Sequence, residues 1–555
     1  MRYRFLYPPF VALLFLALAG CANMPMSGPV VEATVAAGSR AQLVQQAQGP
    51  RDNSTRQQLV SDFLNAVGAG SYDYFEVARQ YLTANANERW HPEVSAVVFD
   101  DSAAPKLTVS GSTVTVASRM VITVDSHGVP TPADADDATL ETSFTLRKVS
   151  GQWRIDDLPQ GILIPQTAFQ NSYVLRRVYY PDSSSQYLVA DPRWVPRSEA
   201  ERQLVLSLIN GPSKPLNEVV SSAFPLAIAD GKGVSVDIDS EKNLAFVSLP
   251  NIAGGYSAKQ LENIQWQLDE TLVEDGTTAS VQLFVGDKLI KPENFNTRVH
   301  LHKQPPDRLV GLRDGDLVSL SGTKTDVLAR AESFSGLRIA ALAQSFDSEP
   351  DVVALVPGTG IIQLTPQVRE LYSVPDSLPP KYDSRGWIWY GSHTDTNRIR
   401  LGNSDGGDAL LDLPWDDFKE LTGLAVSPDG SHLLLVGRVA TGEYRASVAL
   451  IVRNTDGRPE RLRELPNRLS SLTELFDPVW TDTLKSAVLA ADGTVHELSL
   501  GGFTQSYTAP KGVVRLLGGA STGTLEAVGD DWVRYLRVSD SWRNSGGNLD
   551  RPCYP

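Results

Sequence analysis

The chain has 555 residues, more than one domain usually holds, so we expect about three to four domains. Its formal net charge of −15 and its pI near 5.0 argue against a nucleic-acid ligand, because the binding of phosphates needs clustered Lys and Arg. The same acidity disfavours electrostatic adhesion to an anionic membrane surface. Any attachment to a membrane therefore has to come from lipid.

The beginning of the chain has the parts of a secretory signal peptide. Arg2 and Arg4 precede an apolar stretch over residues 5–18, which leads into Leu18-Ala19-Gly20-Cys21. Two prolines interrupt this stretch, and it is too short for the roughly 30 Å of hydrocarbon that about 20 residues span. We predict a signal peptide over residues 1–20 rather than a permanent transmembrane helix.

The four residues that end this segment resemble the lipobox of bacterial lipoproteins. The resemblance implies that the thiol of Cys21 receives a diacylglyceryl group and that type II signal peptidase cuts just before it. Two acyl chains, at about 0.8 kcal/mol per buried methylene, make a stable anchor. We therefore expect lipidation of Cys21 and a place on the extracytoplasmic face of the cell membrane. The alternative is an ordinary signal peptide with an accidental cysteine.

Cys553 is the only other cysteine of the chain. If lipid occupies Cys21, an internal disulfide is impossible. We expect a free thiol in a C-terminal tail, and the alternative is an intermolecular partner.

Residues 21–50 contain much Ala, Gln, Pro and Ser and few residues that could form a core, so we interpret them as a flexible tether. The next part, residues 51–165, begins with two predicted helices, one capped at Ser54 and ending at Gly68, the other over residues 74–82. Period-two stretches then predict strands over residues 94–99, 107–109 and 114–124 and a hairpin over residues 142–155. Helices followed by a curled antiparallel sheet resemble the cone-shaped fold of nuclear transport factor relatives. Such cones hold a ligand or, as we expect here, are filled by their own side chains and act as spacers or docking modules.

Residues 170–292 alternate strands and helices. Strands are predicted over residues 173–180, 234–238, 244–248 and 280–285, and helices follow caps at Ser198 and Ser257. With Leu208-Ile209-Asn210-Gly211-Pro212 at the end of the first helix, this order resembles the GerMN domain of sporulation lipoproteins, an α/β domain. That resemblance brings no catalytic residues with it.

After a proline-bounded linker over residues 293–308, residues 309–545 read as short strands joined by Gly, Asp and Asn turns. The fragment Ser427-Pro428-Asp429-Gly430 between two apolar strands resembles blades of WD-repeat and TolB-type propellers. We expect a C-terminal β-propeller of about five to seven blades, and a β-sandwich is the alternative. The fold class is thus a multidomain α+β chain followed by an all-β part.

Two serine motifs match catalytic patterns but lack the required context. Gly519-Ala520-Ser521-Thr522-Gly523 has the spacing of a nucleophile elbow, which needs a strand before the serine and a helix after it, whereas strand-like residues follow here. Ser321-Gly322-Thr323-Lys324 has the Ser-x-x-Lys spacing of penicillin-recognising enzymes, without their partner motifs. We interpret the first as a hairpin turn and the second as chance.

The remaining candidates for ligand binding are also weak. His300 and His302 would face the same way on a strand, but no third ligand stands at a metal-site spacing. The acidic residues of two further stretches lack the glycine and glutamate of a calcium loop and favour solvated loops; they are Asp134, Asp136, Asp137, Asp237 and Asp239. Trp387 and Trp389, beside Tyr390, could form a stacking platform for a glycan or peptide, or pack between blades. We predict no catalytic, metal or cofactor site, and no enzyme.

The order of lipobox, tether, cone-like domain, GerMN-like domain and propeller resembles the LpqB lipoprotein family of actinobacteria over nearly the whole chain. The resemblance implies a partner, the extracellular domain of an MtrB-like sensor histidine kinase, and an accessory role in an MtrAB-type two-component system that affects cell-wall growth and division. We expect the docking surface on the cone-like or GerMN-like domain. The alternative is a cell-wall-associated glycan-binding or hydrolytic protein that uses the channel of the propeller.

Overall fold

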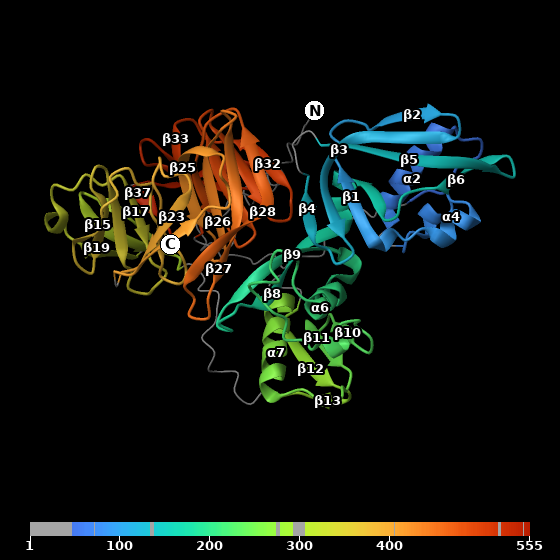
Figure 1. Ribbon diagram of the computed structural model, residues 1–555, viewed down its shortest axis with the longest axis horizontal. Helices are drawn as coiled ribbons and strands as arrows, with labels where there is room; N and C mark the ends of the chain where they lie inside the picture. Colours follow the sequence, from blue (N-terminus) through green and yellow to red (C-terminus); the bar gives the residue numbers. More distant parts are fainter. Residues whose placement is uncertain are drawn as a thin grey trace, which may run out of the picture. The chain divides into compact units, whose positions relative to one another are not determined.

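The computed structural model describes residues 47–555 except 71–72, 134–137, 274–277, 292–305, 323, 405, 520–522 and 548. Cys21, the signal peptide and most of the expected tether lie outside these residues. The described chain is mostly β with few helices and is divided into three successive domains (Figure 1). Within it, none of the helices combines the length and the apolar character that crossing a membrane requires.

The first domain is a seven-stranded sheet covered by helices. The strands run in the order β6-β5-β3-β1-β7, and β2 and β4 also pair with β3. They are β1 (Ser95–Phe99), β2 (Lys106–Ser110), β3 (Thr113–Asp125), β4 (Pro130–Pro132), β5 (Thr139–Val149), β6 (Gln152–Asp157) and β7 (Ile162–Pro165). Helix α2 (Arg56–Ala69) brings Phe63 against Tyr81, Trp90 and Phe144 at ring-centroid distances of 5.7 to 6.1 Å. The helix side of the sheet is therefore filled by the domain's own aromatic side chains.

The helices of this domain differ from the sequence prediction at two points. Thr55, not Ser54, caps α2, because its hydroxyl accepts the backbone N–H of Gln58. The helix expected over residues 74–82 is only α3 (Glu76–Arg79), and α4 (Ala84–Arg89) follows separately. The chain leaves the helix because it pairs with β6: Ile155 donates its N–H to Tyr81 and accepts that of Thr83. A tertiary strand contact thus overrides the local helix pattern.

The second domain packs helices on a four-stranded sheet of order β10-β11-β12-β13, with a separate hairpin of β8 and β9. Helix α5 (Gln166–Ser172) packs on α2, β1 and β7 of the first domain and leads into β8. The helices of the second domain are α6 (Ala200–Asn210) and α7 (Ala258–Val273), and its strands are β8 (Tyr173–Pro181), β9 (Leu188–Pro196), β10 (Ser235–Asp239), β11 (Leu244–Leu249), β12 (Ser280–Val285) and β13 (Lys288–Leu289). The strands β11 and β12 are parallel, and α7 is the crossover between them.

One of the two helix caps predicted here is confirmed and the other is wrong. Ser257 caps α7, since its hydroxyl accepts the N–H of Gln260 at 3.2 Å. Ser198 does not cap α6, because residues Arg197–Glu199 form a 3-10 turn and Glu199 takes the cap position without a side-chain hydrogen bond.

The third domain consists of six four-stranded antiparallel sheets in the described part of the chain, within the expected range of five to seven blades. This arrangement is a β-propeller and not a β-sandwich. The strands are β14 (Leu309–Arg313), β15 (Asp316–Ser321), β16 (Lys324–Ala329), β17 (Ala341–Gln344), β18 (Val352–Val356), β19 (Gly360–Thr365), β20 (Arg369–Tyr372), β21 (Lys381–Tyr382), β22 (Ile388–Tyr390), β23 (Arg398–Gly402), β24 (Asp408–Asp412), β25 (Phe418–Val426), β26 (His432–Val439), β27 (Tyr444–Arg453), β28 (Pro459–Ser471), β29 (Leu475–Trp480), β30 (Lys485–Ala490), β31 (Thr494–Ser499), β32 (Thr504–Thr508), β33 (Val513–Gly518), β34 (Leu525–Gly529), β35 (Arg534–Val538), β36 (Ser541–Gly546) and β37 (Asp550–Cys553).

The last strand of the chain closes the propeller. β37 pairs antiparallel with β14, so the first blade contains strands from both ends of the domain. The propeller therefore extends past residue 545, where the sequence analysis ended it. The four-residue strand was missed because Pro552 and two nearby glycines favour a loop reading of this segment.

Candidate functional site

Several residues that were weighed in the sequence lie outside the described residues: Cys21, His300, His302, Asp134, Asp136, Asp137 and Ser521. Asp237 and Asp239 lie on β10, where Asp239 accepts the N–H groups of Glu241 and Lys242 and pairs with the Lys242 ammonium at 2.9 Å. Asp239 thus shapes a surface turn. Among the described residues, no group of three His, Cys, Asp or Glu side chains is arranged to hold a metal ion.

Both serine motifs lie between antiparallel strands. Residues 519–523 join β33 to β34, which pair with each other, so a strand and not a helix follows Ser521. Ser321 ends β15 and Lys324 begins β16, which also pair. Ser521 itself lies outside the described residues, and the paired strands on either side of the motif agree with the hairpin interpretation.

Trp389 on β22 and Trp387, directly before this strand, contribute to the interior of the propeller. Trp389 is fully buried in a cluster between blades, and its indole N–H donates to the Asp383 carboxylate at 2.9 Å. Trp387 is partly buried against the same cluster. The packing interpretation therefore holds, and the two rings form no exposed platform.

A buried polar network, not expected from the sequence, stabilises the Ser-Pro-Asp-Gly turn. Asp429 accepts the hydroxyls of Ser427 at 2.5 Å and Ser431 at 2.6 Å, and Ser431 lies 2.7 Å from His432 Nδ1. A catalytic triad places the histidine between the acid and the serine, whereas the serine stands in the middle here. All four side chains are buried. The network is an element of the fold, in which each polar group finds a partner.

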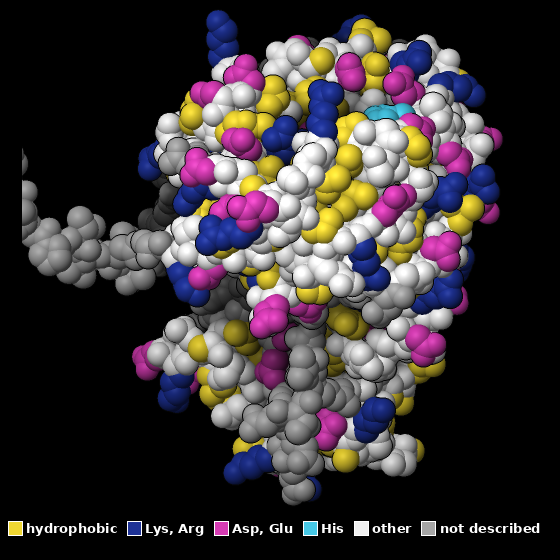
Figure 2. Space-filling model, turned by 90° about the vertical axis from the view of Figure 1, so that its left-hand side faces the viewer, with side chains coloured by type: hydrophobic (Ala, Val, Ile, Leu, Met, Phe, Trp, Pro, Cys, Tyr) yellow, Lys and Arg dark blue, Asp and Glu magenta, His cyan; other side chains and the backbone are white. Residues whose placement is uncertain are grey.

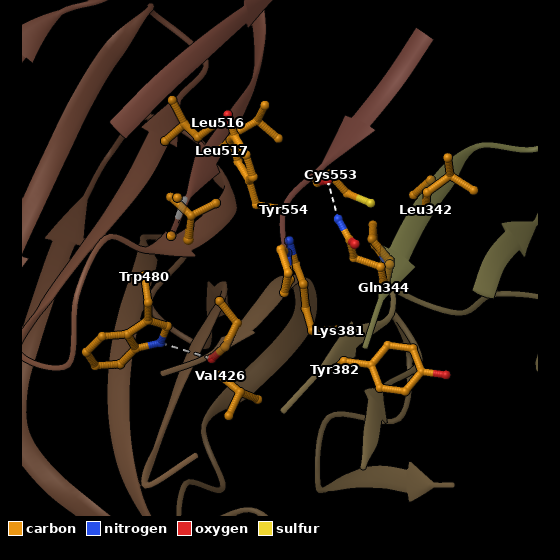
Figure 3. A pocket seen from close by; sticks show the side chains of 18 of the residues that line it. Leu342, Gln344, Lys381, Tyr382, Val426, Trp480, Leu516, Leu517, Cys553 and Tyr554 are labelled. Carbon is orange, nitrogen blue, oxygen red and sulfur yellow. Dashed lines mark hydrogen bonds between the residues drawn. The ribbon is translucent and has the colours of Figure 1, made fainter. Parts of the chain in front are cut away.

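The central channel of the propeller contains a cavity of about 70 Å³. The first strands of five blades line it together with residues 552–555, which lie in the channel and contribute to its wall (Figure 3). Asp477 is the one acidic side chain among its described lining residues. The paired acidic side chains that a hydrolytic channel would need are thus not found among them.

Cys553 is a free thiol, as expected from the sequence, but it is buried in the closing strand and does not lie in a loose tail. Its side chain is 8% exposed, and its carbonyl accepts the side-chain N–H of Gln344 at 2.9 Å. Burial raises the pKa of the Cys553 thiol to about 12. An intermolecular disulfide would have to open the strand pairing first.

Alkylation of Cys553 is accordingly expected to be very slow in the folded protein. The thiolate is the reactive form, and a pKa near 12 instead of 9 lowers its share about a thousandfold at neutral pH. Iodoacetamide labelling of this cysteine, followed by mass spectrometry of its peptide, checks this in buffer and in urea. Equal labelling rates in the two conditions would contradict the buried position.

The second domain and the propeller share a buried interface. At the tip of the β8–β9 hairpin, Asp182 accepts Arg385 Nη1 at 2.8 Å, and both side chains are no more than 6% exposed. The Arg385 guanidinium also lies 4.1 Å from the centroid of the Tyr187 ring. Nearby, Arg177 pairs with Asp482 at 3.1 Å. These contacts fix the hairpin on the propeller, because a buried charge is tolerated only with its partner in place.

The turn between β31 and β32 connects the propeller to the other two domains. Gly501 accepts the indole N–H of Trp194 at 2.9 Å, and Phe503 packs on Trp194 and Phe169. Trp194 and Phe503 belong to the hydrophobic core cluster of the first domain. Residues 47–555 accordingly form one compact unit.

A groove of about 590 Å³ lies where the first and second domains meet. Its volume falls in the range of ligand and peptide pockets, roughly 300 to 1,000 Å³. Aromatic and aliphatic side chains form its walls and charged groups surround them; the main ones are Phe75, Tyr173, Trp194, Leu206, Arg79, Glu93, Asp125, His127 and Glu199.

Tyr74 stands on the rim of this groove, which we call the interdomain groove. Its side chain is 74% exposed, and its hydroxyl donates to Glu199 Oε1 at 2.7 Å, across the two domains. Tyr74 and Phe75 both have left-handed backbones, with φ of 53° and 62°. Such a conformation is an outlier for a bulky residue and tends to occur at functional sites. The Phe75 ring occupies the space where a side chain on Gly70 would begin.

No sequence pattern indicates this groove. Tyr74 was expected at the start of a helix, and none of the described residues weighed for chemistry in the sequence lines the groove. Acidic and basic side chains are interspersed on the face shown in Figure 2, unlike the basic stripe typical of nucleic-acid binding.

Three family models match the chain in order. Residues 49–170 match "Lipoprotein LpqB, N-terminal domain", residues 177–291 match "Sporulation and spore germination", and residues 307–555 match "Lipoprotein LpqB beta-propeller domain". The chain belongs to the LpqB lipoprotein family.

Relatives named LpqB are similar in sequence to this chain over most of its length. The protein from Streptomyces avermitilis is 26% identical over 97% of this chain and 96% of its own. That from Streptomyces coelicolor is 27% identical over 76% of this chain and 77% of its own. A solved structure of TolB from Acinetobacter baumannii, 11% identical, aligns with a TM-score of only 0.30 over 44% of this chain and 66% of that chain, and we draw nothing from it.

Membership in the LpqB family agrees with the resemblance that the order of the parts suggested. The second family model covers the residues of the GerMN-like part, and the third covers the six blades and the closing strand. The interdomain groove is formed mainly by residues within the first two matches, and the channel cavity lies within the third.

Proposed function

We propose that this LpqB-family lipoprotein is a non-enzymatic accessory of an MtrB-like sensor histidine kinase and binds the kinase's extracellular domain through the interdomain groove. Lipid on Cys21 would hold the protein on the extracytoplasmic face of the cell membrane. Through the kinase it would tune an MtrAB-type system and so affect cell-wall growth and division. The observation that carries the proposal is a peptide-sized groove with an exposed, strained aromatic side chain on its rim.

Tyr74 has the properties of an interface anchor. Tyrosine supplies a large contact area at a low entropy cost, and a few such residues carry most of the affinity of an interface. Phe75 packs edge-on against Trp90 at 5.9 Å, and the Arg79 guanidinium lies 5.3 Å from the centroid of the same ring. Packing on the Trp90 ring thus fixes the backbone next to Tyr74. A partner would meet a preorganised aromatic surface and lose less conformational entropy on binding.

The first domain supports the proposal as a docking module. We propose that it is a cone-like domain similar to nuclear transport factor relatives. Its helix-covered side is packed by Phe63, Trp90 and Phe144, which favours recognition at the domain's edge over ligand binding inside the cone. The groove begins at that edge, beside α3 and β1.

The tether favours such an encounter. A flexible linker of about 29 residues has a root-mean-square span of about 30 Å. Lipid on Cys21 would therefore keep the groove in a shallow layer above the bilayer. The effective concentration of an extracellular kinase domain in that layer could reach the millimolar range, so even weak binding would be populated.

Replacing Tyr74 by Ala is expected to weaken binding to the kinase's extracellular domain by about tenfold or more, because the contact loses the exposed ring on the rim of the groove. Titration of the purified full chain against that domain by calorimetry measures the change. Tyr74→Phe keeps the ring and removes the hydroxyl that donates to Glu199, so it distinguishes the contribution of the ring to affinity from that of the hydrogen bond.

Leu472→Ala is the matched control, since Leu472 is 87% exposed on the propeller. This variant is expected to bind like the unaltered chain. Binding that is lost with Leu472→Ala and kept with Tyr74→Ala would move the contact to the propeller. Absence of binding by the unaltered chain at millimolar concentration would remove the support for the kinase partner.

A further inference from the structure

The first domain carries cations and an indole ring together at one end of its sheet. In the hairpin of β5 and β6, Lys148 lies opposite Trp153 on the edge strand β6 (Figure 1). The Trp153 ring contacts two cations, since the Lys148 ammonium and the Arg56 guanidinium lie 5.3 Å and 5.2 Å from its centroid. We call the following group the hairpin tip: Arg56, Val109, Lys148, Val149, Trp153 and Arg154.

The cations of the hairpin tip are not neutralised by partners of their own. Within the described chain, Arg56, Lys148 and Arg154 form no ion pair with a carboxylate. Both arginines donate to backbone carbonyls instead, Arg56 to that of Gly111 and Arg154 to that of Trp153 at 2.7 Å. The chain as a whole carries a net charge of −15, so this local charge is opposite in sign to that of the protein.

The carboxylates near the hairpin tip do not cancel this charge. Asp156 pairs with Arg147 at 2.8 Å, and Asp62 lies 3.8 Å from Arg51, so each of them is matched by a cation outside the tip. Asp52, which is exposed shortly before helix α2, offsets one of the three cations of the tip. Positive charge therefore remains in excess.

Apolar side chains complete this surface. Val149 is 44% exposed next to Lys148, and Val109 on β2 is 39% exposed, two residues before the carbonyl that binds Arg56. Tryptophan is enriched where a membrane meets water, and lysine and arginine are attracted to anionic headgroups there. The combination of an indole ring, exposed valines and unmatched cations is therefore suited to the surface of an anionic bilayer.

The hairpin tip lies close to the point where the chain enters the first domain. Asn53 donates its backbone N–H to Oε1 of Gln152, directly before Trp153, at 2.7 Å. Ala47, the first described residue, is six residues from Asn53 and so at most about 20 Å away. The expected tether would join this point to lipid on Cys21. The tip would thus be held near the bilayer by the attachment itself.

We propose that the hairpin tip binds anionic phospholipid headgroups and so orients the first domain on the membrane. The proposal rests on the lipid anchor of the proposed function, which supplies the attachment, whereas the tip supplies the orientation. Each cation near an anionic surface strengthens such a contact only about fivefold. This is too little to hold an acidic protein on its own, but an anchored chain meets the surface at a high effective concentration.

The test measures which part of an anchored protein contacts the bilayer. Residues 47–555 form one compact unit, so an N-terminal hexahistidine tag can hold this part on vesicles with a nickel-chelating lipid, independently of Cys21. A fluorophore is attached at Val149→Cys and, as the control, at the exposed propeller position in Leu472→Cys, while Cys553 is buried. Lipids with a nitroxide on the headgroup quench a fluorophore that touches the surface.

On vesicles that contain phosphatidylglycerol, we expect quenching at position 149 to be at least about fivefold stronger than at position 472. Most of it should be lost on phosphatidylcholine vesicles and at high ionic strength, because salt screens the attraction. Lys148→Glu is expected to reduce the quenching at position 149 about fivefold. The matched control is Lys419→Glu, which changes an exposed lysine of β25 and should leave the quenching unaltered.

Equal quenching at the two positions, or undiminished quenching on phosphatidylcholine or in folded Lys148→Glu, would overturn the proposal. Circular dichroism shows whether this variant folds, and if it does not, Arg154→Gln decides. Flotation of the full chain with vesicles, after expression with its signal peptide, tests the anchor separately. A full chain that does not float contradicts lipid on Cys21 and leaves the result for the tip standing, whereas absent quenching contradicts the tip alone.

Discussion

Deletion of residues 547–555 is expected to destabilise the propeller by about 4 kcal/mol or more, because it removes the strand that closes the ring. β37 pairs with β14 and buries Leu549 and Cys553, which are 2% and 8% exposed. The deletion would expose the unpaired edge of β14 and leave a void beside the fully buried Val310. Urea unfolding followed by tryptophan fluorescence measures the loss as a lower midpoint.

A shorter deletion provides the control for ring closure. Removal of Tyr554 and Pro555 leaves β37 and its pairing intact, so the midpoint should fall much less. An unchanged midpoint in the longer deletion would show that the ring does not depend on its last strand.

Arg385→Ala is expected to cost about 3–5 kcal/mol, because it leaves the Asp182 carboxylate buried without its cation. Ser184 still donates to Asp182 Oδ1, but a hydroxyl and an amide cannot replace a guanidinium. The loss should appear in the urea midpoint, and the β8–β9 hairpin should become sensitive to protease, since the second domain loses a buried polar contact with the propeller.

Two further variants test whether the loss of stability comes from leaving a charge buried without its partner. Arg461→Ala breaks a contact of 2.7 Å between Arg461 and Glu218 that joins the same two domains, but both side chains are about half exposed, so a much smaller loss is expected. The double variant Asp182→Leu, Arg385→Met removes both charges. It should therefore regain most of the stability that Arg385→Ala loses. Equal losses in Arg385→Ala and Arg461→Ala would show that burial of the pair is unimportant.

The sequence predicted those elements that local patterns determine. Alternating apolar residues marked β1, β3, β10, β11 and β12. The cap of α7 at Ser257 and the blade turn at Ser427-Pro428-Asp429-Gly430 were also found, because a local pattern and a turn need only neighbouring residues. The order of the parts led to the LpqB family, which the family models confirm.

The errors occurred where distant contacts override local preference. Residues 80–82 have a helical pattern but pair with Ile155, and Cys553 looks like part of a tail but completes the first blade. The candidate sites depend even more on tertiary structure. Tyr74 meets Glu199 across two domains, so no spacing in the sequence indicates the interdomain groove.

Photocrosslinking in living cells tests the docking proposal most directly. A benzophenone amino acid in place of Glu93 would put the reactive group on an exposed position of the interdomain groove, and one in place of Leu472 would put it on the exposed propeller loop. We expect the Glu93 position to capture the extracellular domain of the sensor kinase and the Leu472 position not to capture it. Capture of the kinase from Leu472 alone, or from neither position, would contradict docking through the groove.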